Sequence, residues 1–208
     1  MTRNNRLAAA AVGAVVVAAA IAATVVACQA TGDPTPGAST SPTATASASP
    51  SPSPTTPDPE AQAVKDAEYA VRNYYEVTGV MLQDPENFNF EDAKKVAISS
   101  SLVDVQNAYG MYLNDEMHDI GTVAIDSIEL KNVDLTDKPK AKPPVVPVVE
   151  FLVCLDSSDV NTVDKTGKSL NAPGQDPRSL IRAGVANYEY PDGPWLVAYT
   201  TLEEGKKC

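Results

Sequence analysis

Residues 29–60 set the strongest limit on what this 208-residue chain can fold into. The stretch consists of small, polar and proline residues, contains no Leu, Ile, Val or aromatic side chain, and holds eight of the 17 prolines. Without apolar side chains to bury, nothing offsets the conformational entropy that an ordered backbone would cost. We therefore expect an extended, plain spacer here, and O-glycosylation of Ser and Thr next to Pro is the alternative. A folded domain has to be built from residues 61–208, the length of one ordinary domain.

The N-terminal segment, residues 1–27, has the composition of a secretory signal. Arg3 and Arg6 precede an uncharged apolar run at 7–27. A run of this length also suits a membrane-spanning helix. Because small residues follow it instead of a cationic flank, the pattern favours cleavage.

The four residues Val25-Val26-Ala27-Cys28 resemble the lipobox of bacterial lipoproteins. In that family the signal peptide is removed in front of the cysteine, here between Ala27 and Cys28, and the thiol carries a diacylglyceryl group. The acyl chains anchor the product, since each buried methylene contributes about 0.8 kcal/mol. The resemblance implies a protein held on the extracytoplasmic face of the cell membrane through Cys28. Conventional secretory cleavage is the alternative.

The chain is acidic, with 27 Asp and Glu against 16 Lys and Arg and a net charge of −11. Removal of residues 1–27 takes away two arginines and no acid, so the mature chain carries −13. This balance disfavours nucleic acid as a partner, because affinity for phosphates needs clustered Lys and Arg. It also disfavours electrostatic adhesion to anionic lipid. The candidate partners are the membrane, through the lipid anchor, and an envelope protein or cell-wall component.

Apolar residues repeating at three and four positions predict a helix at 61–82 that stops before Pro85. The same period predicts further helices at 91–101 and 103–117. His118 then falls at the predicted end of a helix.

Alternating apolar residues predict a long strand at 121–135, and two jumps of three in that alternation indicate bulges. A Val-rich apolar run at 145–156 is typical of a buried central strand. A turn at 164–167 and two strands on either side of the turn at 191–194 complete the pattern. Helices followed by a curved antiparallel sheet predict an α+β fold.

The order of elements resembles the NTF2-like superfamily, also called cystatin-like or SnoaL-like. It resembles in particular small secreted proteins of Gram-positive bacteria that have a signal, a Ser/Thr/Pro stalk and one such domain. The matching residues are Cys154, Leu155 and Asp156 in one strand and Trp195 and Val197 in the last. The resemblance implies a cone in residues 61–208, with the N-terminal helices packed on the curved sheet. It supplies no biochemical role by itself.

Two hypotheses on function remain open. The first is a non-catalytic binding or protein-interaction module at the cell envelope. Its ligand would meet the concave face of the sheet, with Tyr74, Tyr112 and Trp195 as candidate lining residues. Ordinary core packing is the alternative for each of these side chains.

The second hypothesis is an enzyme, because some NTF2-like relatives isomerise ketosteroids or cyclise polyketides with a carboxylate base and a tyrosine donor. Asp126 or Asp134 would be the base and Tyr74, Tyr75 or Tyr112 the donor. Nothing in the sequence makes these side chains converge, so we expect no catalytic residue and no cofactor.

The two cysteines of the domain, Cys154 and Cys208, are expected to form a disulfide, as cysteines in exported domains generally do. Closing this loop would stabilise the domain by up to about 4 kcal/mol in the chain-entropy model.

Oxygen-rich side chains between two strands do not match a metal-binding motif. Asp156, Asp159, Asn161 and Asp164 miss the spacing of a calcium loop, and no His/Cys pattern for zinc is present. We therefore expect no bound metal and interpret these residues as a solvated loop. The basic, proline-rich residues 138–144 are interpreted as a solvated loop too, with a docking patch as the alternative.

Overall fold

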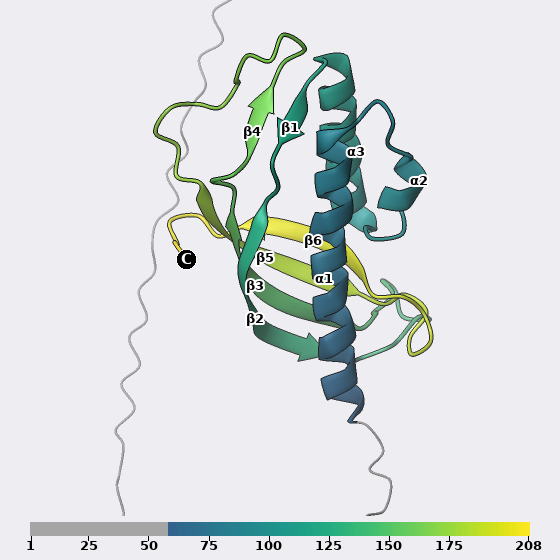
Figure 1. Ribbon diagram of the computed structural model, residues 1–208. Helices are drawn as coiled ribbons and strands as arrows, with labels where there is room; N and C mark the ends of the chain where they lie inside the picture. Colours follow the sequence, from purple (N-terminus) through teal and green to yellow (C-terminus); the bar gives the residue numbers. More distant parts are fainter. Residues whose placement is uncertain (1–57) are drawn as a thin grey trace, which may run out of the picture. The chain divides into compact units, whose positions relative to one another are not determined.

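The computed structural model describes residues 58–208. These residues form three helices followed by six strands, which confirms the predicted α+β class. The elements are α1 (Pro59–Gln83), α2 (Phe90–Ala93), α3 (Ser99–Asn114), β1 (His118–Ile120), β2 (Ala124–Asp134), β3 (Val148–Asp156), β4 (Asn161–Val163), β5 (Arg178–Ala186) and β6 (Leu196–Leu202). Four strands form an antiparallel sheet in the order β2-β3-β5-β6, and β1 pairs with β4 separately. Figure 1 shows the large sheet curving behind α1.

Helix α1 begins and ends at the signals that its sequence provides. The side chain of Asp58 accepts a hydrogen bond of 3.1 Å from the backbone N–H of Glu60, and Pro59 occupies the first turn, which needs no N–H. The helix stops before Asp84, since Pro85 disfavours a helical conformation in the preceding residue. Its buried residues repeat at three and four positions and are Ala63, Ala67, Ala70, Val71, Tyr74, Thr78 and Met81.

The second predicted helix, 91–101, is wrong. Only the short α2 forms there, and α3 starts at Ser99, before its predicted first residue. The backbone between them pairs with β6 instead: Ile98 N–H donates to the carbonyl of Val197 at 2.9 Å, and Val197 N–H donates to Val96 at 3.0 Å. The apolar residues of this segment are buried against a strand, and that burial explains their hydrophobicity without a helical face.

The core lies between α1 and the large sheet. The side chains of β3 and β5 that face the helix are 8% exposed or less: Val149, Phe151, Val153, Ile181, Ala183 and Val185. Burying one of the Val, Ile or Phe side chains stabilises the fold by about 1.5–3 kcal/mol relative to leaving it exposed. The helix-covered face of these central strands is therefore filled by side chains.

Strand β2 contains both predicted bulges. Its register against β3 shifts between Ile125 and Ser127 and again between Leu130 and Asn132. Each extra residue bends the strand and restores the side-chain alternation that the sequence had interrupted. The apolar side chains that thereby pack against the core are Ile125, Ile128 and Val133.

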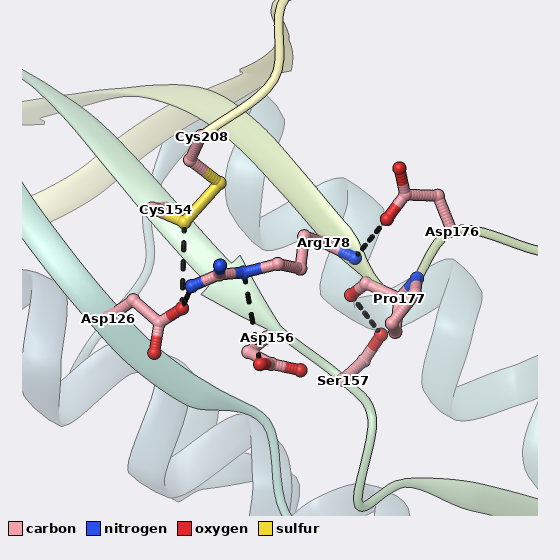
Figure 2. Close-up of a disulfide and its surroundings, with 8 residues drawn as sticks. All are labelled: Asp126, Cys154, Asp156, Ser157, Asp176, Pro177, Arg178 and Cys208. Atoms are coloured by element: carbon pink, nitrogen blue, oxygen red, sulfur yellow. Dashed lines mark hydrogen bonds and ion pairs between the residues drawn. A yellow bond between two sulfur atoms is a disulfide. The ribbon is translucent and has the colours of Figure 1, made fainter.

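The C-terminal tail is fastened to β3 by a disulfide between Cys154 and Cys208, which confirms the predicted pairing. The two Cα atoms lie 5.7 Å apart and the bond spans 54 positions of sequence. Figure 2 shows Arg178 beside this disulfide, with its guanidinium directed toward Asp126 and Asp156.

Candidate functional site

A cavity of about 290 Å³ lies between α1, α3 and the segments that adjoin β1. Its apolar walls are formed by Met81, Leu82, Val105, Ala108, Val123 and Val160. Exposed residues, among them Asp104 and Thr122, also line it, so the cavity communicates with solvent on that side. A space of this size and composition suits a small, largely apolar molecule.

Small residues create the space. A Cβ built on Gly79 would meet no heavy atom within 4 Å, although the helical positions around it carry large side chains. Ala108 faces the cavity from α3. A larger side chain at Gly79 would therefore occupy volume that is open in this structure.

The loop at Gly121 shapes the edge of the cavity near β2. Gly121 has a φ of +88°, and a Cβ there would lie 1.9 Å from the carbonyl oxygen of Asp159. Only glycine fits this close approach of two backbone segments. The side-chain amide of Gln83 donates to the Gly121 carbonyl at 2.7 Å and ties the loop to the end of α1.

Two adjacent tyrosines of α1 line the cavity. The rings of Tyr74 and Tyr75 meet edge to face, with centroids 5.1 Å apart and an interplanar angle of 87°. Burial raises the pKa of each hydroxyl above its ordinary value, so both are neutral phenols at physiological pH. The Tyr75 hydroxyl makes no hydrogen bond to any residue in 58–208, so it can donate to a molecule in the cavity.

A carboxylate on β1 connects the cavity to a buried tyrosine. Oδ1 of Asp119 accepts hydrogen bonds from the Tyr112 hydroxyl at 2.9 Å and from Thr162 Oγ1 at 2.7 Å. Asp119 lines this cavity, whereas Tyr112 lines a neighbouring hollow. Burial, and then the carboxylate of Asp119, raise the pKa of Tyr112. These hydrogen bonds hold Asp119 in a fixed orientation at the cavity wall.

Of the three predicted lining residues, only Tyr74 lines this cavity. Tyr112 borders a neighbouring hollow of about 230 Å³ beside Lys165. Trp195 lies in another hollow, of about 310 Å³, next to Tyr69 of α1. The structure therefore does not bring the three aromatic side chains together. The cavity also lies away from β3, β5 and β6, where the sheet was expected to meet a ligand.

The two aspartates considered as catalytic bases lie outside the cavity. Asp126 forms an ion pair with Arg178 near the disulfide (Figure 2). Asp134 accepts a hydrogen bond of 2.9 Å from the backbone N–H of Thr136, and the side chain of Thr136, followed by this backbone interaction, lowers the pKa of the carboxyl. Neither has a tyrosine hydroxyl as a hydrogen-bond partner among residues 58–208. Sequence analysis missed Asp119 because the region around His118 was expected to end a helix, whereas it forms β1.

The acidic residues between β3 and β5 fix local turns. Asp156 and Asp164 accept backbone N–H groups two residues further along the chain, at 2.8 Å each, and Asn161 accepts from Ser169 at 2.6 Å. No group of three or more His, Cys, Asp and Glu side chains suited to a metal ion occurs within residues 58–208. Residues 138–144 form a mostly exposed loop between β2 and β3.

The predictions for the N-terminal part fall outside the described residues. They concern the signal segment 1–27, the cleavage between Ala27 and Cys28, lipidation of Cys28, and most of the spacer at 28–60. Within residues 58–208, no helix has both the length and the apolar character that crossing a membrane requires.

Comparison with known proteins gives a similarity to solved structures and no match to a family. No family model and no curated protein matches the chain. Among solved structures, the intermembrane space region of the chloroplast protein ARC6 is similar over 66% of this chain and 94% of that one, with a TM-score of 0.45 and 9% sequence identity. A similarity of this extent supports no statement about family or function.

Proposed function

We propose that this chain is a lipid-anchored, extracytoplasmic binding module that holds a small ligand without transforming it. The observation that carries the proposal is the cavity of about 290 Å³ between α1 and α3. Apolar walls with a few polar groups at fixed places are the usual construction of a ligand site. The helix-covered sides of β3 and β5 offer no such space, because the core fills them.

We also propose that the domain is NTF2-like. The order of helices before a curved antiparallel sheet supports this assignment. The matching residues support it as well: Cys154 and Asp156 lie in the central strand β3, and Val197 lies in the last strand, β6.

The anchoring part of the proposal is based on sequence. The segment that ends in Cys28 resembles a lipobox, and residues 29–60 suit a spacer between membrane and domain. A module held in this way would meet ligands or envelope partners near the outer surface of the cell membrane.

A matched pair of glycine substitutions tests the ligand site. Gly79→Leu would fill the cavity, whereas Gly110→Leu places the same side chain on α3 at a position that has no neighbour within 4 Å and does not line the cavity. A panel of small aromatic and aliphatic compounds would be screened against the full chain by ligand-observed NMR. We expect binding by the native chain and by Gly110→Leu, and none by Gly79→Leu at comparable thermal stability. Equal binding by all three chains would exclude the cavity as the site.

One observation favours a second function, an isomerase, cyclase or dehydratase. Asp119 lines the cavity as a candidate base, and the hydroxyl of Tyr75 lines the same cavity as a candidate proton donor. This pair differs from the aspartates proposed from sequence. Turnover of any compound in the panel that Asp119→Asn abolishes, with folding retained, would establish the enzyme in place of the binding module.

A further inference from the structure

The polar lining of the cavity carries charge of only one sign. Two of its residues are acidic, Asp104 from α3 and Asp119 from β1, and none of its lining residues is Lys, Arg or His. Two carboxylates that line one cavity give it a negative potential, which a bound cation would lower. The cavity therefore favours positively charged molecules over neutral or negative ones of the same shape.

Both carboxylates have oxygen atoms that can accept a hydrogen bond or ion pair from a ligand. The two hydrogen bonds that Asp119 accepts within residues 58–208 end on Oδ1, which leaves Oδ2 free of protein donors in that part of the chain. Asp104 is solvent-exposed and lies close enough to the Tyr74 hydroxyl to affect its ionisation. It forms no ion pair with a residue in 58–208.

The aromatic and apolar walls suit the rest of such a molecule. The ring faces of tyrosines attract organic cations, with a gain that grows when water is excluded. Tyr74 and Tyr75 meet edge to face beside the cavity, and Met81, Leu82 and Val105 provide aliphatic contacts. A hydrated metal ion would use neither kind of wall.

We propose that the ligand of this cavity is a small organic cation, an alkyl- or aryl-ammonium compound whose charge lies near Asp104 and Asp119 and whose apolar part contacts Tyr75 and Val105. This inference rests on the proposed binding function and specifies its ligand class. The net charge of −11 supports it, because an acidic protein attracts cations and repels anions at long range.

Two probes that differ only in charge test the class. Choline carries a trimethylammonium group, and 3,3-dimethylbutan-1-ol replaces its nitrogen by carbon. Each would be titrated into the full chain in a neutral maltoside detergent by calorimetry or ligand-observed NMR. We expect choline to bind at least about tenfold more tightly than the alcohol, and its affinity to fall as NaCl is raised.

Charge-neutralising variants locate the contact. Asp104→Asn and Asp119→Asn should each weaken the affinity for choline by about fivefold or more. The affinity for the alcohol should not change, since asparagine keeps the shape of the side chain and removes its charge. Asp115→Asn is the matched control, because Asp115 is the C-cap residue of α3 and does not line the cavity. That variant should bind choline like the native chain.

The outcomes separate the ligand class from the binding function. Equal or tighter binding of the alcohol, lost in Gly79→Leu, would overturn the cationic class and leave the proposed function standing. Choline binding that Asp104→Asn and Asp119→Asn do not weaken would also overturn it. If neither probe nor any compound of the panel binds in a manner sensitive to Gly79→Leu, both proposals fail.

Discussion

The hydroxyl of Tyr199 on β6 donates a hydrogen bond of 2.5 Å to Oε1 of Glu150 on β3, although β5 lies between these two strands. The residue between them is Gly184, which pairs with Glu150 on one side and with Tyr199 on the other. Because glycine has no side chain, the tyrosine ring can lie across β5 and reach the carboxylate. Glu150, Gly184 and Tyr199 thus form a row that links β3, β5 and β6 on the face of the sheet opposite the core.

Gly184→Ala should destabilise the domain. A Cβ at this position would lie 2.1 Å from Cε1 of Tyr199, so the ring would have to move and its bond to Glu150 would break. Overpacking of this kind costs about 1–3 kcal/mol, measurable by urea unfolding. In a Tyr199→Ala background the same substitution should cost much less, since the clash is gone. An equal cost in both backgrounds would show that the ring does not cover Gly184.

Ionisation of Tyr199 should weaken folding at alkaline pH. Burial, followed by the hydrogen bond to Glu150, raises the pKa of Tyr199 from 10.0 to about 12. A raised pKa means that the folded state retains the proton longer than the unfolded state does. The contribution is therefore complete below pH 10 and is lost as the pH rises toward about 12.

Other tyrosines also have raised pKa values, so the pH dependence of the native chain alone does not report on Tyr199. The difference in free energy of unfolding between the native chain and Tyr199→Phe isolates the effect of this one hydroxyl. We expect the native chain to be more stable at pH 8 by about 1 kcal/mol, the usual net value of a hydrogen bond. That advantage should shrink between pH 10 and 12. A constant difference across this range would contradict the assignment.

The disulfide should account for a large part of the stability of the domain. Cys154→Ala with Cys208→Ala frees a loop of 54 positions, which costs up to about 4 kcal/mol in the chain-entropy model. Denaturant unfolding measures the loss. Thiol titration of the unreduced, denatured native chain should detect neither Cys154 nor Cys208, and two reactive thiols there would disprove the bond.

The elements that depend on local pattern were predictable from sequence. Helix α1 follows from one apolar face and its end at Pro85, and β2 shows its two bulges at the jumps in its alternation. Segment 91–101 was mispredicted because a few apolar residues look alike in a helix and in a backbone that pairs with a strand. Its partner, β6, lies about 100 residues further along the chain.

The cavity could not be predicted from sequence. It depends on the absence of a side chain at Gly79 and on segments that meet only in the folded domain. Asp119 comes from a three-residue strand, too short to show an alternation. Tyr74 was a candidate on its residue type, yet the same argument also selected Tyr112 and Trp195, which lie in other hollows. Residue type therefore suggested what kind of side chain lines the site, and tertiary contacts decided which one does.

Replacement of Cys28 tests the anchor. Cys28→Ser removes the thiol that would carry the acyl chains, and two such chains are needed for stable membrane attachment. We expect the variant to appear in the medium or to persist as an uncleaved precursor, detected by fractionation and mass measurement. Native-like processing with full retention in the membrane fraction would contradict lipidation at this residue.

Gly79→Ala should stabilise the domain while it narrows the cavity between α1 and α3. Alanine in a helix interior is favoured over glycine by roughly 1 kcal/mol, and a Cβ at Gly79 meets no atom within 4 Å. Gly110→Ala should give a similar gain on α3. Thermal and urea unfolding would measure both gains. If the open space serves binding, the two variants should differ only in their affinity for the ligand. Gly79→Ala should weaken that affinity, and Gly110→Ala should leave it unchanged. A glycine that costs stability at the cavity wall would then be explained by the volume it leaves for the ligand.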